Sequence, residues 1–194
     1  MRPVRYSVAM SLDGYIAGPN GEYDWIVMDP ELGKEFPELF GRYDTMLVGR
    51  KSFTAAGGQG GGGGPFGGMK VVVFSRTLSP ADHPGVTIVR DDAVEAVRQL
   101  RESPGKDIWL FGGGSLFRTL LDAGQVDFVE VGVIPVLLGG GIPLLPSPAA
   151  RASLKLTSHR VYEKTGTVML EYQVAKNTAG KRPRSGRTSA KPRT

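Results

Sequence analysis

The chain has 194 residues, of which 40% are hydrophobic and 22% are charged, as in one ordinary globular domain rather than a disordered or membrane-spanning protein. It has no cysteine and two histidines, which excludes disulfides, thiolate nucleophiles and cysteine zinc sites, and we predict no bound metal. The formal net charge is +5, but seven of the 24 basic residues and none of the 19 acidic residues lie in residues 176–194. Residues 1–175 therefore have 17 basic and 19 acidic residues, a net charge of −2, which disfavours a nucleic-acid-binding surface on them.

The two ends of the sequence set the expected limits of the folded part. No apolar run approaches the roughly 20 residues needed to cross a bilayer, and the basic start at Met1 and Arg2 is not followed by a signal-like segment, so we expect a cytoplasmic protein without membrane contact. Residues 176–194 contain no large apolar residue and are predicted to form a disordered basic tail after one domain of residues 1–175. Weak binding of nucleic acid by this tail is the alternative to a simple solvated appendage.

The first half of the chain is predicted to be rich in strands. Val4, Tyr6, Val8 and Met10 alternate with other residues and fall on one face of a first strand. Short apolar runs of the kind found in buried central strands follow at residues 45–48, 70–74 and 86–89. These runs indicate a sheet that is covered on both faces.

Two segments between these strands have a less regular pattern. Residues 29–43 are predicted to form a broken helix, because Asp29 and Pro30 are typical of a helix start whereas Gly33 and Pro37 interrupt helices. Residues 55–68 contain nine glycines in fourteen residues and are predicted to form a mobile surface loop. This loop is either an active-site flap or a variation in loop length, and the second interpretation is favoured because loops tolerate insertions.

In the second half, helix-like and strand-like periods alternate. Asp92 is predicted to cap one helix, and Gly124 is predicted to end a second helix that begins at Ser115. Strands are predicted at residues 108–111 and 126–134.

The last part of the folded sequence is predicted to form an antiparallel hairpin. Residues 154–162 and 168–174 have strand-like patterns and flank the turn Lys164-Thr165-Gly166. Taken in order, the segments predict a three-layer α/β domain with a mixed, mostly parallel sheet that ends in this hairpin.

Candidate site residues are those that directly follow the predicted strands, because ligands of open α/β sheets lie beyond the carboxyl ends of the parallel strands. The turn Gly112-Gly113-Gly114-Ser115 follows one strand and precedes a helix, where a bare backbone and free N–H groups suit a diphosphate. The turn lacks the spacing of the dinucleotide-binding fingerprint, and no Walker sequence occurs anywhere in the protein. A plain tight turn is therefore an equal alternative.

Arg50 and Arg76 each follow a predicted central strand and lie beside Ser52 and Ser75. Two guanidinium groups and two hydroxyls on neighbouring strands suit a terminal phosphate monoester. With a diphosphate on the glycine turn, this pattern predicts NADPH rather than NADH as the cofactor. A single arginine of this kind is more often a solvated surface charge, an explanation that is less expected for two at matched positions.

Three further residues are candidates for the substrate side of the site. Asp13 is the first candidate for catalysis, as a polar contact or proton source, because it follows the first strand at the ligand edge. Trp25 is a candidate stacking wall for a flat heterocycle, and Asp29 is a candidate substrate-binding acid. The alternatives are that Asp13 stabilises its own Asp-Gly turn, that Trp25 packs in the core and that Asp29 caps a helix.

Together these segments resemble the dihydrofolate-reductase-like superfamily, and in particular the reductase domain of riboflavin biosynthesis, over roughly residues 3–174. The similar segments are Ser11-Leu12-Asp13-Gly14-Tyr15-Ile16-Ala17 and residues 46–53, 74–76, 111–116 and 135–140. The resemblance implies an eight-stranded mixed sheet, a homodimer, and an NADPH-dependent reductase that acts on a pyrimidine- or pteridine-like substrate, similar to 5-amino-6-(5-phosphoribosylamino)uracil reductase. It also implies that the cofactor is bound by Ala9, Ile16, Ala17, Gly49, Arg50, Lys51, Ser52, Ser75, Arg76, Phe111, Gly112, Gly113, Gly114, Ser115 and Leu116.

The sequence departs from this family in two places. The riboflavin enzymes often pair the reductase domain with a zinc deaminase, whose cysteine ligands are absent here. Asp127-Phe128 also stands where that branch usually has an Asp-Glu pair. Two other functions stay open: dihydrofolate reductase proper, and a non-enzymatic nucleotide-binding module whose basic tail binds nucleic acid.

Overall fold

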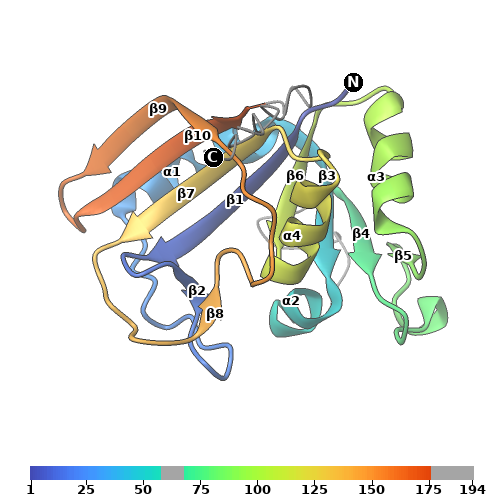
Figure 1. Ribbon diagram of the computed structural model, residues 1–194, viewed down its shortest axis with the longest axis horizontal. Helices are drawn as coiled ribbons and strands as arrows, with labels where there is room; N and C mark the ends of the chain where they lie inside the picture. Colours follow the sequence, from blue (N-terminus) through green and yellow to red (C-terminus); the bar gives the residue numbers. More distant parts are fainter. Residues whose placement is uncertain (58–67, 176–194) are drawn as a thin grey trace, which may run out of the picture.

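The fold is built on one eight-stranded sheet, in a computed structural model that describes residues 1–57 and 68–175. The strand order is β5-β4-β3-β6-β1-β7-β10-β9, and all pairs from β5 to β7 are parallel (Figure 1). β10 is antiparallel to both of its neighbours, so the sheet ends in the antiparallel hairpin expected from the sequence. The predicted fold class is confirmed. The strands are β1 (Val4–Ser11), β3 (Tyr43–Gly49), β4 (Lys70–Phe74), β5 (Val86–Val89), β6 (Asp107–Gly112), β7 (Phe128–Ile134), β9 (Leu154–Tyr162) and β10 (Thr167–Val174).

Helices cover both faces of the sheet and enclose two apolar cores. On one face, α3 and α4 pack over a cluster that includes Val4, Tyr6 and Leu110, and Tyr6 stacks on Phe117 with ring centroids 3.9 Å apart. On the other face, α1 and α2 contribute Phe40 and Phe53 to a cluster around Trp109. The alternation predicted for β1 is thus explained by burial of one face against α3 and α4. The helices are α1 (Pro30–Gly41), α2 (Arg50–Ala55), the short 3₁₀ helix η1 (Pro80–Asp82), α3 (Ala93–Glu102) and α4 (Gly114–Asp122).

The first helix corrects one expectation. Residues 30–41 form a single helix although Pro37 lies inside it, so the predicted break does not occur. Pro37 removes one backbone hydrogen bond, but the helix is held at several points by tertiary contacts, which outweigh this local cost. Phe40 packs on Trp109, and Glu35 accepts a hydrogen bond of 2.8 Å from the hydroxyl of Tyr162.

Four short elements were not predicted, namely the helices α2 and η1 and the strands β2 and β8, and two predictions lie outside the described residues. β2 (Tyr15–Ala17) and β8 (Ile142–Pro143) form a separate two-stranded antiparallel sheet beyond the carboxyl end of β1. Their brevity leaves no period to detect in the sequence. The predicted loop at residues 55–68 and the predicted tail at residues 176–194 fall mostly or wholly outside the described residues.

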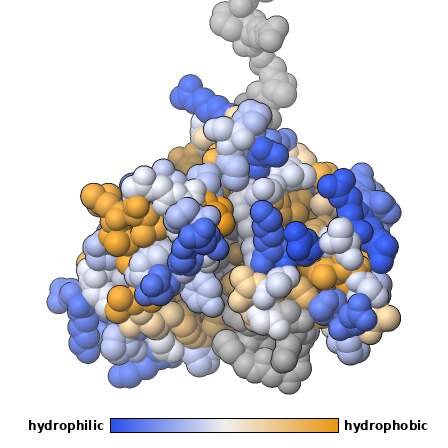
Figure 2. Space-filling model, turned by 90° about the horizontal axis from the view of Figure 1, so that it is seen from below, coloured by the Kyte–Doolittle hydropathy of each residue, from blue (hydrophilic) through white to orange (hydrophobic). Residues whose placement is uncertain are grey.

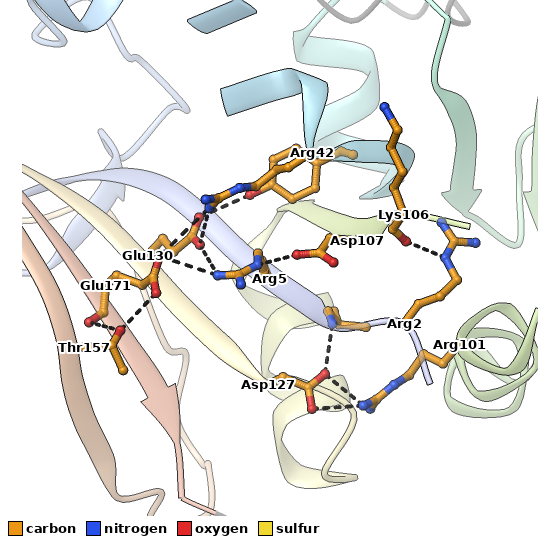
Figure 3. A network of polar contacts seen from close by, with 12 residues as sticks. Arg2, Arg5, Arg42, Arg101, Lys106, Asp107, Asp127, Glu130, Thr157 and Glu171 are labelled. Carbon is orange, nitrogen blue, oxygen red and sulfur yellow. Dashed lines mark hydrogen bonds and ion pairs between the residues drawn. The ribbon is translucent and has the colours of Figure 1, made fainter. Parts of the chain in front are cut away.

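A buried ionic network joins the strands at their amino ends (Figure 3). The Arg5 guanidinium donates to Asp107 and to Glu130 at 2.7 Å each, and the side chains of Arg5 and Glu130 are only 13% and 9% exposed. Glu130 also accepts a hydrogen bond of 3.2 Å from the hydroxyl of Tyr43. Because these residues belong to β1, β6, β7 and β3, the network fixes how four neighbouring strands align. Glu171 on β10 lies 3.5 Å from Arg5 and extends it to a fifth strand.

Asp127 takes part in a second contact of this edge. Its carboxylate accepts two hydrogen bonds of 2.9 and 2.8 Å from Arg101 on α3, and a third of 2.9 Å from the backbone N–H of Val4 (Figure 3). A carboxylate at this position therefore attaches α3 to the start of β1. Asp127 matches the first residue of the Asp-Glu pair that is usual in the related family, and only Phe128 differs. The centre of the Phe128 ring lies 3.9 Å from the Arg5 guanidinium carbon.

We predict that Glu130→Gln lowers the free energy of unfolding by about 3 kcal/mol, because it leaves the buried guanidinium of Arg5 with only one of the two carboxylates that accept from it at 2.7 Å. Urea unfolding followed by circular dichroism measures the change. The control is Glu102→Gln, which removes a carboxylate that is 49% exposed and should change stability by less than about 0.5 kcal/mol. Equal effects of the two substitutions would show that the buried network does not hold the strands together.

Candidate functional site

Three of the predicted bends meet at the carboxyl edge of the sheet. Figure 2 shows the molecule from below Figure 1, the side toward which β4 points, with hydrophilic and apolar side chains interspersed. Gly49 ends β3, and a Cβ placed on it would lie 3.6 Å from the backbone nitrogen of Gly113. A Cβ on Gly113 would lie 3.0 Å from the Ser52 hydroxyl oxygen. Phe74 pairs with Gly49, so the bend after β4 begins beside the bend after β3. The turns after β3, β4 and β6 thus form one continuous surface.

The glycine turn has a structural reason for each glycine. Gly112 has φ +139°, a conformation that residues with a Cβ rarely adopt. Gly113 faces Ser52, and a Cβ on Gly114 would lie 2.9 Å from the carbonyl oxygen of Pro143. The close packing therefore supports the tight-turn explanation of these glycines.

The start of α4 adds hydrogen-bond donors to this turn. Gly113 is the N-cap and has no side chain to act as a cap, so the N–H groups of the first helical turn lack the partner that a capping residue would give them. Ser115 is exposed in this turn. Phe111 and Leu116 send their side chains toward the two cores, so that only their backbone faces the edge. The donors and the positive end of the helix dipole suit an anion.

Cationic side chains surround the bends after β3 and β4. Arg50 and Lys51 occupy the first turn of α2, and Arg76 follows β4; all three are exposed. Within the described part of the chain, their side chains make no hydrogen bond or ion pair. Three cations without protein partners beside an uncapped helix start form an anion-attracting surface.

Ser75 was predicted to contact a phosphate but shapes its own turn, and Arg90 is a residue at this edge that the sequence analysis missed. Ser75 is buried, and its hydroxyl accepts hydrogen bonds of 3.2 and 3.0 Å from the backbone N–H groups of Thr77 and Leu78, so it shapes the turn that presents Arg76. Arg90 follows β5 at the same edge and donates to the carbonyl of Leu78 at 3.2 Å. The rule that identified Arg50 and Arg76 would have found Arg90 as well, because its strand was predicted correctly.

The residues predicted to line the nicotinamide lie on the neighbouring strand. Ala9 on β1 is the register partner of Gly132 on β7, which in turn pairs with Met169 on β10. A Cβ on Gly132 would lie 2.9 Å from the sulfur of Met169, so the Met169 side chain covers this glycine on the α1 face. Ile16 and Ala17 lie in β2, just beyond the end of β1.

The contacts of Asp13 suit a structural role, in which its carboxylate holds the loop at residues 138–139, better than they suit proton donation. Its carboxylate accepts a hydrogen bond of 2.6 Å from the Ser11 hydroxyl and bonds of 3.1 and 2.7 Å from the N–H groups of Leu138 and Gly139. The hydrogen bond from Ser11, with those from the two backbone groups, lowers the pKa of Asp13. A carboxyl that is ionised at neutral pH has no proton to give, so the geometry favours the turn-stabilising alternative.

Asp29 and Trp25 also make local contacts. Asp29 is 1% exposed and is the N-cap of α1: one oxygen accepts from the Glu31 N–H at 2.8 Å and the other from the Thr165 hydroxyl at 3.0 Å. Burial raises the pKa of Asp29, but these hydrogen bonds outweigh it and the net shift is downward. The indole N–H of Trp25 donates to the carbonyl of Glu22 at 3.1 Å. The helix-cap alternative for Asp29 is therefore the one that the structure supports.

A cavity of about 620 Å³ lies elsewhere, at the amino edge of the sheet beneath the end of α1. Phe36, Phe40, Tyr43, Asp44 and Lys106 are among the residues that line it. This cavity therefore lies at the edge opposite to the one at which the sequence predicts the nucleotide. Converging turns, unpaired cations and an uncapped helix are more specific indications, and they occur together only where β3, β4 and β6 end within the described ranges.

Comparison with known proteins gives one family. The profile of the RibD C-terminal domain matches residues 2–168. The uncharacterized protein YyaP of Bacillus subtilis is 37% identical over 185 residues, which cover 88% of this chain and 94% of that protein. Both matches span nearly all of the described residues.

Two solved structures have a similar fold at low identity. The deaminase and 5-amino-6-(5-phosphoribosylamino)uracil reductase of Thermotoga maritima superposes with a TM-score of 0.66 at 21% identity, over 90% of this chain and 57% of that enzyme. Dihydrofolate reductase from Enterococcus faecalis, solved with NADP(H), superposes with a TM-score of 0.65 at 18% identity, over 89% of this chain and 96% of that enzyme. No helix in residues 1–57 or 68–175 has both the length and the apolar character to span a membrane.

We predict that Asp13→Ala increases hydrogen exchange at the amides of Leu138 and Gly139, because these N–H groups lose their acceptor. In the unmodified protein the tie should be intact above the ordinary aspartate pKa of 3.8 and should be lost as pH falls through the lowered pKa of the folded state. Exchange protection measured by NMR tests both statements. Asp122→Ala is the matched control, since it removes the acceptor of the Ala150 N–H and should leave residues 138 and 139 protected. Unchanged protection in Asp13→Ala would contradict the assignment.

Proposed function

Because the chain belongs to the RibD C-terminal domain family, we propose that it is an NADPH-dependent reductase that transfers hydride to a pyrimidine- or pteridine-like substrate in the cytoplasm. The observation that carries this proposal is the meeting of the glycine turn, the uncapped start of α4 and the unpaired Arg50 and Arg76 at one sheet edge. A diphosphate and a terminal phosphate monoester are the anions that this combination suits best.

The residues at the edge fit the proposed cofactor at two places, its diphosphate and the phosphate on its adenosine. The turn at Gly112 and Gly113, where a Cβ would meet Ser52, provides backbone donors for the diphosphate. Arg50 and Arg76 would hold the phosphate on the adenosine, and Lys51 and Arg90 add positive charge on either side. The remaining proposed contacts are Gly49, Ser75 through the turn it shapes, and Ser115.

The proposed reaction needs orientation more than it needs reactive side chains. When bound, the dihydronicotinamide supplies a hydride to an electrophilic carbon of an imine or of an open-chain sugar carbonyl, and a proton completes the reduction at the nitrogen or oxygen. The protein's contribution is to place the two reactants in contact and to exclude competing water. Ala9, a small residue on β1 beside Gly132, is the proposed contact of the nicotinamide ring on this strand.

Water is the proposed source of the proton. Asp13 and Asp29 were the acids predicted for the substrate side, and hydrogen bonds lower the pKa of both carboxyls. Each oxygen of Asp29 is already occupied, and Asp13 holds the loop at residues 138–139. A reduction that needs no acidic side chain is consistent with a substrate whose product nitrogen or oxygen is basic enough to take a proton from solvent.

Dihydrofolate reduction is the second candidate function. The fold similarity to the Enterococcus faecalis enzyme favours it, since that enzyme aligns over 96% of its length. The occupied carboxylate of Asp29 weighs against it, because protonation of a pteridine ring benefits from a free acid at the ring.

We predict that the protein binds NADPH more tightly than NADH, and that Arg50→Ala and Arg76→Ala each weaken NADPH binding by roughly 10- to 100-fold, the worth of one hydrogen-bonded charge pair. Binding of NADH should change little, because it lacks the extra phosphate. Isothermal calorimetry measures both. Arg151→Ala removes an exposed arginine far from this edge and should leave both affinities unchanged. Equal affinities for the two cofactors in the unmodified protein would refute the proposed phosphate site.

We predict that oxidation of NADPH by the protein is faster with an aminopyrimidine that has an open-chain sugar than with dihydrofolate. The rate should not fall between pH 6 and 8 through loss of an acidic side chain's proton, because both candidate carboxyls stay ionised there. Absorbance of the reduced cofactor, followed with each substrate over this pH range, is the measurement. Faster turnover of dihydrofolate would select the second candidate function.

A further inference from the structure

Most of the exposed large apolar side chains lie in the segments that follow β1 and β7. Of the ten that the described part of the chain has, six are in residues 11–28 or 134–146. They are Leu12, Tyr23, Val27, Met28, Leu137 and Ile142, with exposed fractions between 38% and 69%. Exposed apolar residues that gather in one region are typical of a binding surface.

Backbone contacts bring these two segments together. The N–H of Leu12 donates to the carbonyl of Val136 at 2.9 Å, so the bend after β1 lies against the loop that holds Leu137. β2 and β8 pair beyond the ends of both strands, and there Ile142 is the register partner of Ala17 (Figure 1). Ala17 is a proposed contact of the nicotinamide, so the exposed leucines lie in the segments next to that contact.

The segment before α1 reaches the same place. Asp29, which follows Met28, accepts a hydrogen bond of 3.0 Å from Thr165 in the β9–β10 turn. That turn lies against the start of the loop after β7, since a Cβ on Gly166 would lie 3.4 Å from the Pro135 ring. Three segments therefore meet where β1 and β7 end. We call their exposed side chains the apolar rim, which consists of Leu12, Val27, Met28 and Leu137.

The charge of these segments is negative. Residues 134–150 contain no charged residue, and residues 11–28 contain three acids and no base. With the first turns of α1 and the end of the hairpin included, residues 11–35, 134–150 and 160–166 have seven acids and three bases, a net charge of −4. A ligand with further negative charge would be repelled here.

The three bases are poor candidates for holding a phosphate. Arg160 lies 2.6 Å from a carboxylate oxygen of Glu35 and is thus already paired. Burial raises the pKa of Asp29, and the hydrogen bonds described above outweigh it with help from the charge of Lys164, which is engaged there. Lys34 is exposed on α1, and one exposed ammonium group in water binds a dianion weakly.

The cofactor side of the same edge has the opposite character. Arg50, Lys51 and Arg76 lie beyond β3 and β4, next to the uncapped start of α4. A phosphate beyond β1 and β7 would instead meet carboxylates and apolar side chains, where it is both repelled and poorly solvated. The edge therefore selects an anionic ligand at one end and a neutral ligand at the other.

We propose that the substrate of this protein is a heterocycle that carries no phosphate, and that an uncharged substituent of the heterocycle contacts the apolar rim. The inference rests on the proposed function, which places the substrate beside the nicotinamide at the ends of β1 and β7. It distinguishes this protein from the Thermotoga maritima enzyme, whose name specifies a phosphoribosyl compound.

Two compounds that differ only in a phosphate test the proposal. They are 5-amino-6-(5-phosphoribosylamino)uracil and the same molecule without its phosphate, each added to the full-length protein. Calorimetry with saturating NADP⁺ measures binding, and absorbance with saturating NADPH measures turnover. The compound without phosphate should bind at least about 10-fold more tightly, because the phosphate is repelled and finds no cation pair. The difference should shrink from about 0.05 to about 0.5 M salt, which screens the repulsion.

A cation placed on the rim should reduce this discrimination. Leu137→Lys changes a side chain that is 69% exposed and should strengthen binding of the phosphorylated compound by roughly 3- to 10-fold. The matched control is Leu154→Lys, at a leucine that is 45% exposed at the start of β9, and it should leave the affinities for both compounds unchanged. Circular dichroism confirms that each variant is folded, and Leu12→Lys replaces Leu137→Lys if the latter does not fold.

The outcomes separate this proposal from the proposed function. Equal or tighter binding of the phosphorylated compound by the unmodified protein would overturn the proposal, and so would binding of neither compound. Binding of the compound without phosphate and no oxidation of NADPH would support the neutral site and contradict the reductase function. Unchanged affinity for the phosphorylated compound in both rim variants would overturn the assignment of the rim to the substrate.

Discussion

The parallel pairing of β5, β4, β3, β6, β1 and β7 is the constraint on which the other features depend. Parallel strands put all their amino ends at one edge and all their carboxyl ends at the other. The protein uses the two edges differently. The amino edge holds charges in mutual contact, with Arg5 and Glu130 at the centre, whereas at the carboxyl edge Arg50 and Arg76 have no partner among the described residues. Compensated charge stabilises the sheet at one edge, and uncompensated charge is available for a ligand at the other.

The carboxyl edge is shaped before any ligand arrives. Ser52 approaches Gly113, the residues at 143 and 146 approach Gly114, and Ser75 bonds the backbone of its own turn. These contacts are all within the protein, so the bends do not need a bound anion to hold them in place. A site of this kind loses little conformational entropy when it binds, which favours tight and specific recognition of a nucleotide.

Sequence periodicity was sufficient for the fold and for the position of the bends, because strand and helix periods and helix caps are local properties. The hairpin, the cap at Asp92 and the alternation along β1 all agree with the structure. The roles of Asp13 and Asp29 could not be decided in the same way, because their partners Leu138 and Thr165 lie more than 100 residues away in the sequence. The unbroken α1 has the same cause, since distant tertiary contacts outweigh the local effect of Pro37.

The use of both acids as structural ties bears on the chemistry that this scaffold can perform. Asp13 joins the bend after β1 to the loop after β7, and Asp29 joins the start of α1 to the β9–β10 turn, so each carboxylate holds two distant segments of the chain together. A carboxylate that donates a proton must spend part of each cycle neutral, and a neutral Asp13 or Asp29 would weaken the contact that it makes. In the proposed reductase, Asp13 and Asp29 therefore position segments of the chain and transfer no proton. Under that proposal, the preferred hydride acceptors are those whose product takes its proton from solvent.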